Sequence, residues 1–180
     1  METAEGRAFL IDNAERNVRI GDGQLDPNRM FSRSGAEKNL RSLNPSWSEA
    51  QLQSALVRLD KDRGKFLKFV LPSNGGLLIA LHNNGPGYSL SDEAPISDKA
   101  ALNDKDHPHE FMLCTMHEDF EKAASSPFNV VLQNTAPKED DGSLSRLCAS
   151  MGVRYINIEA SHGNSGAQNR MLDWVEKELS

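Results

Sequence analysis

Three stretches of the chain contain side chains that could do chemistry. In DPNRMF, residues 26–31, Asn28 and Arg29 place an amide beside a guanidinium, and a planar guanidinium can hold a carboxylate through two parallel hydrogen bonds. His82 follows the apolar run LLIAL, and Glu159 follows RYINI. If both runs are strands of an α/β sheet, these two side chains stand where such sheets bind ligands. The sequence therefore offers a candidate carboxylate site and two candidate catalytic groups.

Each of these residues also has a plainer interpretation. A surface turn explains Asp-Pro-Asn, although it leaves the apolar pair Met30 and Phe31 unexplained. His82 could cap a strand end, and Glu159 could accept a backbone N–H of the next helix. Both interpretations stay open here. KEDDGSLSR, residues 138–146, indicates a solvated turn before a helix, and we expect no chemistry there.

The elements that would position these residues alternate between strands and helices. Apolar runs predict strands at residues 7–11, 18–20, 75–82, 110–115, 128–133 and 153–160. Helical spacing predicts helices at residues 34–43, 44–62, 117–124, 141–152 and 166–179. The first two strands could form a hairpin, and Ser46 with Glu49 has the form of a capping box. This order predicts one α/β domain over residues 1–180, with a mixed, mainly parallel sheet flanked by helices.

Composition and charge argue against several classes of protein. The 180 residues are 38% hydrophobic and 26% charged, which is ordinary for a globular chain that buries a core. A formal charge of -6 without any basic run argues against nucleic-acid binding. No apolar run approaches the ~20 residues that span a bilayer, and METAEGRAFL lacks the features of a signal peptide, so we expect a cytoplasmic protein without a membrane partner. Cys114 and Cys148 lie in apolar contexts and are expected to be buried thiols.

Residues 83–109 are polar and rich in Gly, Pro, Asp and Ser, which predicts a long loop of the kind that is often functional. Tyr88 in this loop is a candidate substrate contact, although a loop Tyr is as often half-buried packing. At the end of the loop, DHPHE places His107, His109 and Glu110 at a spacing that could bind a metal ion on an extended segment. The plainer interpretation is a turn stiffened by its proline.

Taken together, the three stretches resemble motifs of the zinc carboxypeptidases. DPNRMF resembles the family's Asp-x-Asn-Arg-Asn-Phe motif, and IALHNN resembles the later strand that ends in its third zinc ligand. VRYINIEASHG resembles the Tyr-x-x-x-Glu strand that holds its catalytic carboxylate. The stretches occur in the family's order, and the resemblance runs from about Gly6 to the C-terminus. The wider group of succinylglutamate desuccinylase-like and aspartoacylase-like deacylases is similar as well.

The resemblance implies a zinc-dependent hydrolase that cleaves an amide bond adjacent to a free carboxylate. Asn28 and Arg29 would bind the terminal carboxylate of a small peptide or an acylated amino acid, with Tyr88 as a further substrate contact. His82 would be a zinc ligand. Glu159 would take a proton from the zinc-bound water and pass it to the leaving nitrogen.

The chain departs from the family at its other two zinc ligands. The family takes them from a His-x-x-Glu motif upstream of the Asn-Arg pair, and residues 1–27 contain no histidine. One imidazole is too few, because catalytic zinc sites usually have about three protein ligands. The ligands could lie upstream in a longer chain or come from DHPHE. Alternatively, the chain is a truncated, non-catalytic carboxylate-binding module of the same fold, or an unrelated α/β domain. The Arg that would polarise the scissile carbonyl is one of three: Arg7, Arg16 and Arg19.

Overall fold

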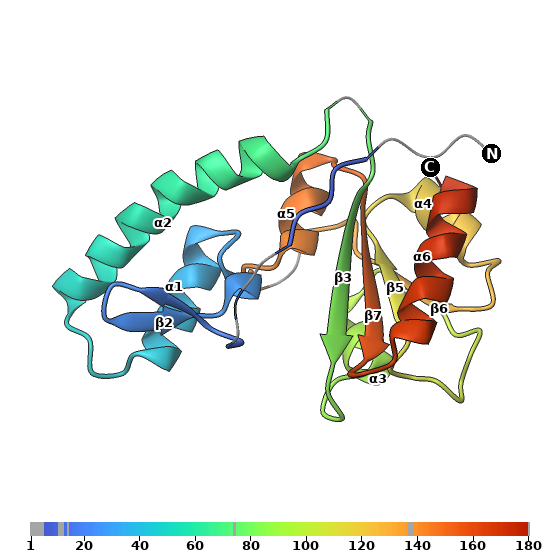
Figure 1. Cartoon of the computed structure of the whole chain (residues 1–180), viewed down its shortest axis with the longest axis horizontal. Coiled ribbons are helices and arrows are strands. Elements are labelled where there is room, and N and C mark those ends of the chain that lie inside the picture. The colour runs from blue at the N-terminus through green and yellow to red at the C-terminus, as the bar shows by residue number, and fades with distance from the viewer. Residues whose placement is uncertain (1–5, 11–12, 14, 74, 137–138, 180) are drawn as a thin grey trace. The chain divides into compact units, whose positions relative to one another are not determined.

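The computed structural model describes residues 6–10, 13, 15–73, 75–136 and 139–179 (Figure 1). The contacts within the chain divide it into two compact units, which we name the sheet unit and the hairpin unit. The sheet unit contains Pro72–Pro137 and Cys148–Ser180, and the hairpin unit contains Gly6–Leu71 and Lys138–Leu147. The expectation of one domain over residues 1–180 concerns how these units join, so it stays a prediction.

A mixed five-stranded sheet forms the centre of the sheet unit. In chain order its strands are β3 (Leu78–Asn84), β4 (Lys99–Ala101), β5 (Phe111–Cys114), β6 (Asn129–Leu132) and β7 (Tyr155–Ser161). Their spatial order is β3-β7-β5-β6-β4. The pairs β3–β7 and β5–β6 are parallel, whereas β5–β7 and β4–β6 are antiparallel. The expected mixed α/β sheet is confirmed, but parallel pairs do not outnumber antiparallel pairs, because β5 and β4 each run against a neighbour.

Helices α4 (His117–Ala123) and α6 (Ser165–Leu179) pack on one face of this sheet. Buried residues of α6 recur at the helical spacing that places them on one side of the helix. Side chains alternate between the two faces of a strand, so every second strand residue joins this core. The core consists of Met112, Cys114, Phe120, Ala123, Val130, Leu132, Ile156, Ile158, Ala160, Ala167, Met171, Val175 and Leu179. The strand residues that alternate with these, including the polar ones discussed below, lie on the opposite face.

Short elements follow β3 within the sheet unit. They are the helical turn α3 (Leu90–Glu93) and the 3-10 helix η2 (Ala94–Ile96). Residues 83–109, which the sequence predicts to be a long loop, therefore contain regular secondary structure. Ser89 and Asp92 form a capping box that starts α3.

The hairpin unit begins with two short antiparallel strands, β1 (Val18–Ile20) and β2 (Gly23–Leu25). Gly21 turns the chain between them with a φ of 61°, a conformation that glycine adopts without steric cost. The predicted hairpin of residues 7–11 with 18–20 is wrong, since residues 7–10 form no strand and 18–20 pair with 23–25. Residue 11 lies outside the described residues.

The hairpin is followed by the helices η1 (Pro27–Arg29), α1 (Arg33–Leu43) and α2 (Glu49–Val70). The hairpin unit has its own apolar core, formed by residues of the hairpin, α1 and α2. It consists of Ile20, Leu25, Ala36, Leu40, Leu52, Ala55 and Leu56. The capping box of α2 is formed by Ser48 and Gln51, not by Ser46 and Glu49. The start shifts because Trp47 still donates its backbone N–H to the Asn44 carbonyl in the preceding turn.

Two glycines allow a turn from the end of the hairpin unit to lie against α1 and η1. A Cβ on Gly35 would lie 2.3 Å from the Cα of Gly142, and a Cβ on Gly142 would lie 2.4 Å from the Arg29 carbonyl oxygen. The backbone N–H of Phe31 donates to the Gly142 carbonyl at 2.9 Å. Backbone therefore meets backbone here, and residues 139–141 are held close to Arg29. The helix α5 (Leu144–Met151) starts directly after this turn.

Both cysteines are free and buried, as the sequence predicts. Burial raises the pKa of the Cys148 thiol to about 12 and that of Cys114 further still. Neither thiol is therefore a nucleophile at neutral pH.

Candidate functional site

The strands β3 and β7 bring His82 and Glu159 side by side. These residues are direct partners in the parallel register, and His82 Nδ1 lies 3.3 Å from Glu159 Oε1. The His82 side chain is 34% exposed and the Glu159 side chain only 7% exposed. A buried carboxylate next to a partly open imidazole can exchange a proton with it or be oriented by it. The structure therefore joins two of the residues that the sequence singles out.

Two asparagines hold the Glu159 carboxylate in place. Asn157 Nδ2 donates to Oε1 at 2.9 Å, and Asn84 Nδ2 approaches Oε2 at 3.4 Å while donating to the His109 carbonyl at 2.7 Å. All of these side chains lie on the face of the sheet away from α4 and α6, because they occupy alternate positions of paired strands. Each oxygen of the carboxylate therefore faces an amide donor.

Among the described residues, no hydrogen-bond partner lies near the buried amide oxygens Asn84 Oδ1 and Asn157 Oδ1. A buried acceptor that makes no hydrogen bond costs about 1–3 kcal/mol, so such groups are usually satisfied by water or by a bound molecule. Both amides keep the orientation in which their N–H groups face Glu159.

Tyr155 lies two residues before Asn157 on β7, so it shares the face of Asn157 and Glu159. Burial, the nearby Cys148 and the charge of Glu159 all raise the pKa of its phenol well above the usual value. The phenol therefore stays protonated at neutral pH.

Tyr88, the predicted substrate contact, belongs to the sheet unit and has protein partners of its own. Its hydroxyl donates to the carboxylate of Glu93, and its ring packs against Phe111 with the centroids 5.9 Å apart. Gln133 donates to the other oxygen of Glu93. A structural role for Tyr88 is thus visible, and its contact with a substrate stays a prediction.

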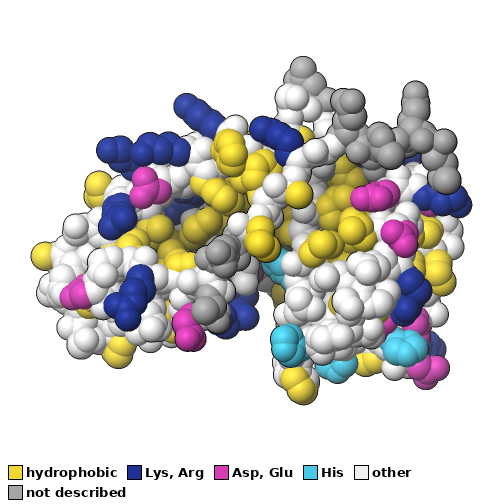
Figure 2. Space-filling model, in the orientation of Figure 1, with side chains coloured by type: hydrophobic (Ala, Val, Ile, Leu, Met, Phe, Trp, Pro, Cys, Tyr) yellow, Lys and Arg dark blue, Asp and Glu magenta, His cyan; other side chains and the backbone are white. Residues whose placement is uncertain are grey.

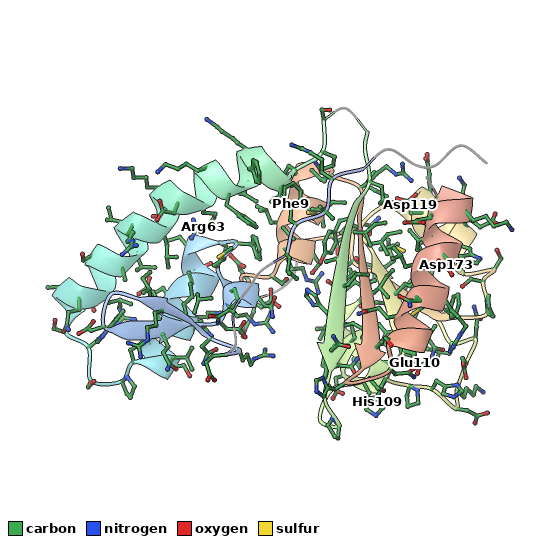
Figure 3. The ribbon with its side chains drawn as sticks, viewed as in Figure 1. Phe9, Arg63, His109, Glu110, Asp119 and Asp173 are labelled. Carbon is green, nitrogen blue, oxygen red and sulfur yellow. The ribbon has the colours of Figure 1, made fainter. Side chains whose placement is uncertain are left out.

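The three side chains of DHPHE take separate partners. His107 Nδ1 lies 2.8 Å from Asp104, His109 Nδ1 lies 2.7 Å from the Tyr88 carbonyl, and Glu110 accepts from Asn164. Histidine side chains gather at the end of the sheet unit toward which the β3 and β7 arrows point, where His109 is labelled (Figures 2 and 3). In the described parts of the chain, no group of three or more His, Cys, Asp or Glu side chains could hold a metal ion.

Zinc was predicted from the resemblance, and His82 is the residue that would hold it. Its nearest acidic neighbour is Glu159, so the two together supply one imidazole and one carboxylate. A catalytic zinc site usually needs about three protein ligands. The described residues therefore do not form a complete zinc site.

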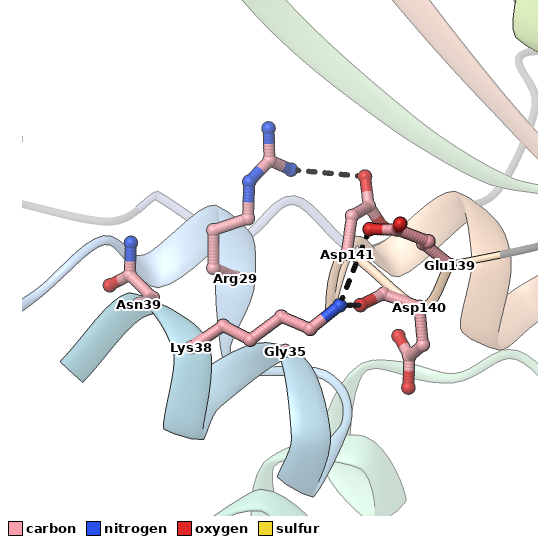
Figure 4. Close-up of a pocket in the computed structure, with 7 residues that line it drawn as sticks. All are labelled: Arg29, Gly35, Lys38, Asn39, Glu139, Asp140 and Asp141. Atoms are coloured by element: carbon pink, nitrogen blue, oxygen red, sulfur yellow. Dashed lines mark hydrogen bonds and ion pairs between the residues drawn. The ribbon is translucent and has the colours of Figure 1, made fainter. Parts of the chain in front are cut away.

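Asn28 and Arg29 belong to the hairpin unit, in η1. Asp26 starts this turn by accepting the backbone N–H of Asn28 at 2.9 Å, and Pro27 presets its φ. The predicted anchor Phe31 is buried, so the backbone beside Arg29 is fixed, as the sequence suggests. Arg29 itself lines a pocket of about 300 Å³, together with Gly35, Lys38, Asn39, Glu139, Asp140 and Asp141 (Figure 4).

Positive and negative side chains are interleaved around this pocket. Arg29 Nη1 lies 3.5 Å from Asp141, and Lys38 Nζ lies 3.6 Å from Glu139. Asp140 accepts hydrogen bonds from Ser34 Oγ at 2.5 Å and from the backbone N–H of Gly142 at 2.9 Å. Partial burial alone would raise the pKa of Asp140. Hydrogen bonds, together with the charge of Lys38, overcome that effect and hold the pKa below its usual value.

Several site residues escaped the sequence reasoning. The turn KEDDGSLSR was expected to lack chemistry, yet three of its carboxylates line the Arg29 pocket. No local signal relates residues 139–141 to Arg29, which is far away in the chain. Asn157 was missed for a different reason: it precedes Glu159 by two positions on a strand, so alternation could have shown that both share a face.

Comparisons of the chain with models of protein families, with curated proteins and with solved structures find no significant match to any of them. The likeness to zinc carboxypeptidases therefore rests on the three stretches alone. Within the described residues, none of the helices has both the length and the apolar character needed to cross a membrane.

Proposed function

We propose that the chain is a hydrolase that cleaves an amide bond adjacent to a free carboxylate, of the carboxypeptidase or N-acyl amino acid deacylase type. The pairing of His82 with Glu159 at 3.3 Å on neighbouring parallel strands is the observation that carries this proposal. The pair lies near the carboxyl ends of both strands, which is the common position of ligand sites in α/β sheets. The resemblance makes Glu159 the catalytic carboxylate and His82 a zinc ligand.

Glu159 moves the proton in this proposal. Its carboxylate takes a proton from a water molecule, whose oxygen attacks the carbonyl carbon of the amide. The carbon–nitrogen bond then breaks, and Glu159 returns the proton to the departing nitrogen. Because Asn84 and Asn157 each face one carboxylate oxygen, Glu159 keeps its orientation throughout and little reorganisation is needed.

Within the hairpin unit, Arg29 is the proposed binding group for a free carboxylate, with Asn28 as a neighbouring donor. The support for this role is chemical: a guanidinium with a 40% exposed side chain on a fixed backbone can form two parallel hydrogen bonds to a carboxylate. The substrates of this proposal are small peptides and acylated amino acids.

The proposal is tested by assaying purified chain for release of free amine from acetyl-, succinyl- and formyl-amino acids and from dipeptides. Glu159→Gln is expected to lower kcat/KM at least about 100-fold, because an amide cannot accept the proton. Glu176→Gln changes the same residue type on the exposed side of α6 and is the matched control. Equal turnover by Glu159→Gln and the control would exclude the role given to Glu159.

A second candidate, a non-catalytic carboxylate-binding module of the same fold, is favoured by the incomplete set of metal ligands among the described residues. Metal analysis separates the two. About one zinc per chain, lost in His82→Ala, supports the enzyme. A metal-free chain without turnover that binds small carboxylates, and loses them in Arg29→Ala, supports the module.

A further inference from the structure

The two edges of the five-stranded sheet differ in how well they are protected against pairing with another chain. The strand order places β3 at one edge (Figure 1) and β4 at the other. β4 has only three residues, and its exposed Lys99 pairs with Glu121 at 3.1 Å. Short length and an exposed lysine are common protections of a sheet edge. β3 has seven residues, LIALHNN, with no proline and no Lys, Arg, Asp or Glu, so it lacks both protections.

The outer side of β3 has backbone groups that no described residue satisfies. The backbone N–H of Leu78 donates to the Arg154 carbonyl at 3.0 Å, so every second residue from Leu78 onward faces β7. In a parallel pair, the N–H and C=O of one residue point to the same side, and successive residues alternate. The N–H and C=O groups of Ile79, Leu81 and Asn83 therefore point away from β7. Within the described parts of the chain, these groups make no hydrogen bond.

Leu81, in the middle of this edge, has an exposed apolar side chain. It is 48% exposed, although Ile79 on the same face packs against the core beneath α4 and α6. A long apolar edge with unpaired backbone groups is a template for a further strand. The strand that fits this edge has an apolar side chain to place against Leu81 and has backbone groups with the same spacing. The β3 strand of a second copy of the chain meets both conditions.

We propose that β3 is a dimerisation edge, at which the β3 strands of two copies pair antiparallel and join their sheets. Full overlap of the seven residues fixes the register, with Leu81 opposite Leu81 of the second copy and Ile79 opposite Asn83. In this register the outward N–H and C=O groups of all three residues are hydrogen-bonded across a two-fold axis, which is the commonest symmetry of homodimers. Since neither strand contains an acidic residue, a lysine or an arginine, the contact brings no such like charges together.

The pairing also joins two copies of the candidate site. His82 lies on the same face of the sheet as Glu159, and it stands opposite Ala80 of the second copy. The two His82 side chains then occupy diagonal positions, with their Cβ atoms about 7–8 Å apart. Each copy thus contributes an imidazole to the face on which the other has its His82–Glu159 pair. The dimer does not depend on the proposed function, because backbone groups and Leu81 form it.

Sedimentation velocity of the full chain, from about 1 µM to about 1 mM, tests the inference. We expect a reversible dimer with a Kd of about 10–100 µM, because one strand pair buries less than the ~1,600 Å² of a standard interface. Leu81→Lys places two ammonium groups opposite each other and should weaken the dimer at least about tenfold. Leu102→Lys changes an apolar side chain of similar exposure, 52%, directly after β4, and should leave the dimer unchanged.

Mixing two charged variants separates loss of the contact from loss of the fold. Leu81→Glu should also be monomeric on its own. An equimolar mixture of Leu81→Lys and Leu81→Glu should dimerise again, because the two-fold register places the opposite charges side by side. A chain that had failed to fold could not regain a partner on mixing. An unaltered chain that stays monomeric, a Leu81→Lys dimer as tight as the unaltered one, or a mixture that stays monomeric overturns the inference.

Discussion

Glu159 and His107 show two different uses of a hydrogen-bonded charge in one unit. Glu159 is buried and faces amide donors at both oxygens, which suits a group that must keep one orientation during proton transfer. His107 is exposed and pairs with Asp104 at 2.8 Å. The first arrangement serves chemistry in our proposal, whereas the second joins residues within one loop and has a consequence for stability that can be measured.

The Asp104–His107 pair should stabilise the fold in a limited pH window. Its hydrogen bond lowers the pKa of Asp104 and raises that of His107. The Asp104 contribution is complete above the ordinary pKa of 3.8 and is lost as the pH falls through the lower folded value. The His107 contribution is complete below the ordinary pKa of 6.5 and is lost as the pH rises through the higher folded value. The pair therefore stabilises the fold mainly between pH 3.8 and pH 6.5.

Thermal unfolding of Asp104→Asn at about pH 5 and about pH 8 checks this expectation. The melting temperature of the variant should fall further below that of the unaltered chain at the lower pH, because both partners are charged in the unaltered chain there. Asp173→Asn, an exposed acid of α6, should show no such difference. A deficit of the same size at both pH values would contradict the assignment.

At the scale of elements, the contact between α1 and the turn that contains Gly142 shapes the Arg29 pocket. A methyl group at Gly35 would meet backbone atoms of Gly142, and backbone cannot move aside as a flexible side chain can. Gly64, in the middle of α2, is the opposite case, because nothing lies near the place where its Cβ would be. The same substitution in two helices should therefore have opposite effects.

Gly35→Ala should lower the free energy of unfolding by about 1–3 kcal/mol, because the added methyl group overpacks the contact with the turn. Gly64→Ala should raise the free energy of unfolding by about 0.5–1 kcal/mol through helix propensity. Urea titrations of the two variants measure both effects, and a stabilised Gly35→Ala would disprove the close contact.

At the scale of the whole molecule, two separate apolar cores lie in the two units. Met171 is buried in the core of the sheet unit, and Leu56 is buried in the core of the hairpin unit. Truncation of either to Ala should cost about 2–5 kcal/mol, because a cavity remains where the side chain packed.

Hydrogen exchange shows whether each loss stays within its own unit. We expect Leu56→Ala to speed amide exchange in the hairpin unit and Met171→Ala to speed it in the sheet unit, since local stability follows local packing. Uniformly faster exchange across both units in either variant would instead support the single cooperative domain that the sequence suggests.

The sequence predicted the features that depend on local periodicity, and it missed those that depend on distant partners. Apolar runs located β3 and β7 closely enough to select His82 and Glu159, and the spacing of Met171 and Val175 located α6. The position of Asp141 beside Arg29 depends on the path of the chain between them, which has no local pattern. The capping box of α2 lies two residues later than the sequence predicts for a similar reason. The spacing of apolar residues does not reveal the turn that precedes the helix.

The parallel pairing of β3 with β7 makes the His82–Glu159 contact sensitive to some length changes and indifferent to others. Extra residues in the loops between the two strands would leave the contact intact, since the ladder of backbone bonds aligns the strands whatever length of chain connects them. One residue inserted inside β3 ahead of His82 would turn the imidazole to the face covered by α6 and bring an apolar neighbour opposite Glu159. Homologues that keep this chemistry should therefore tolerate insertions after Asn84 but not within LIALH.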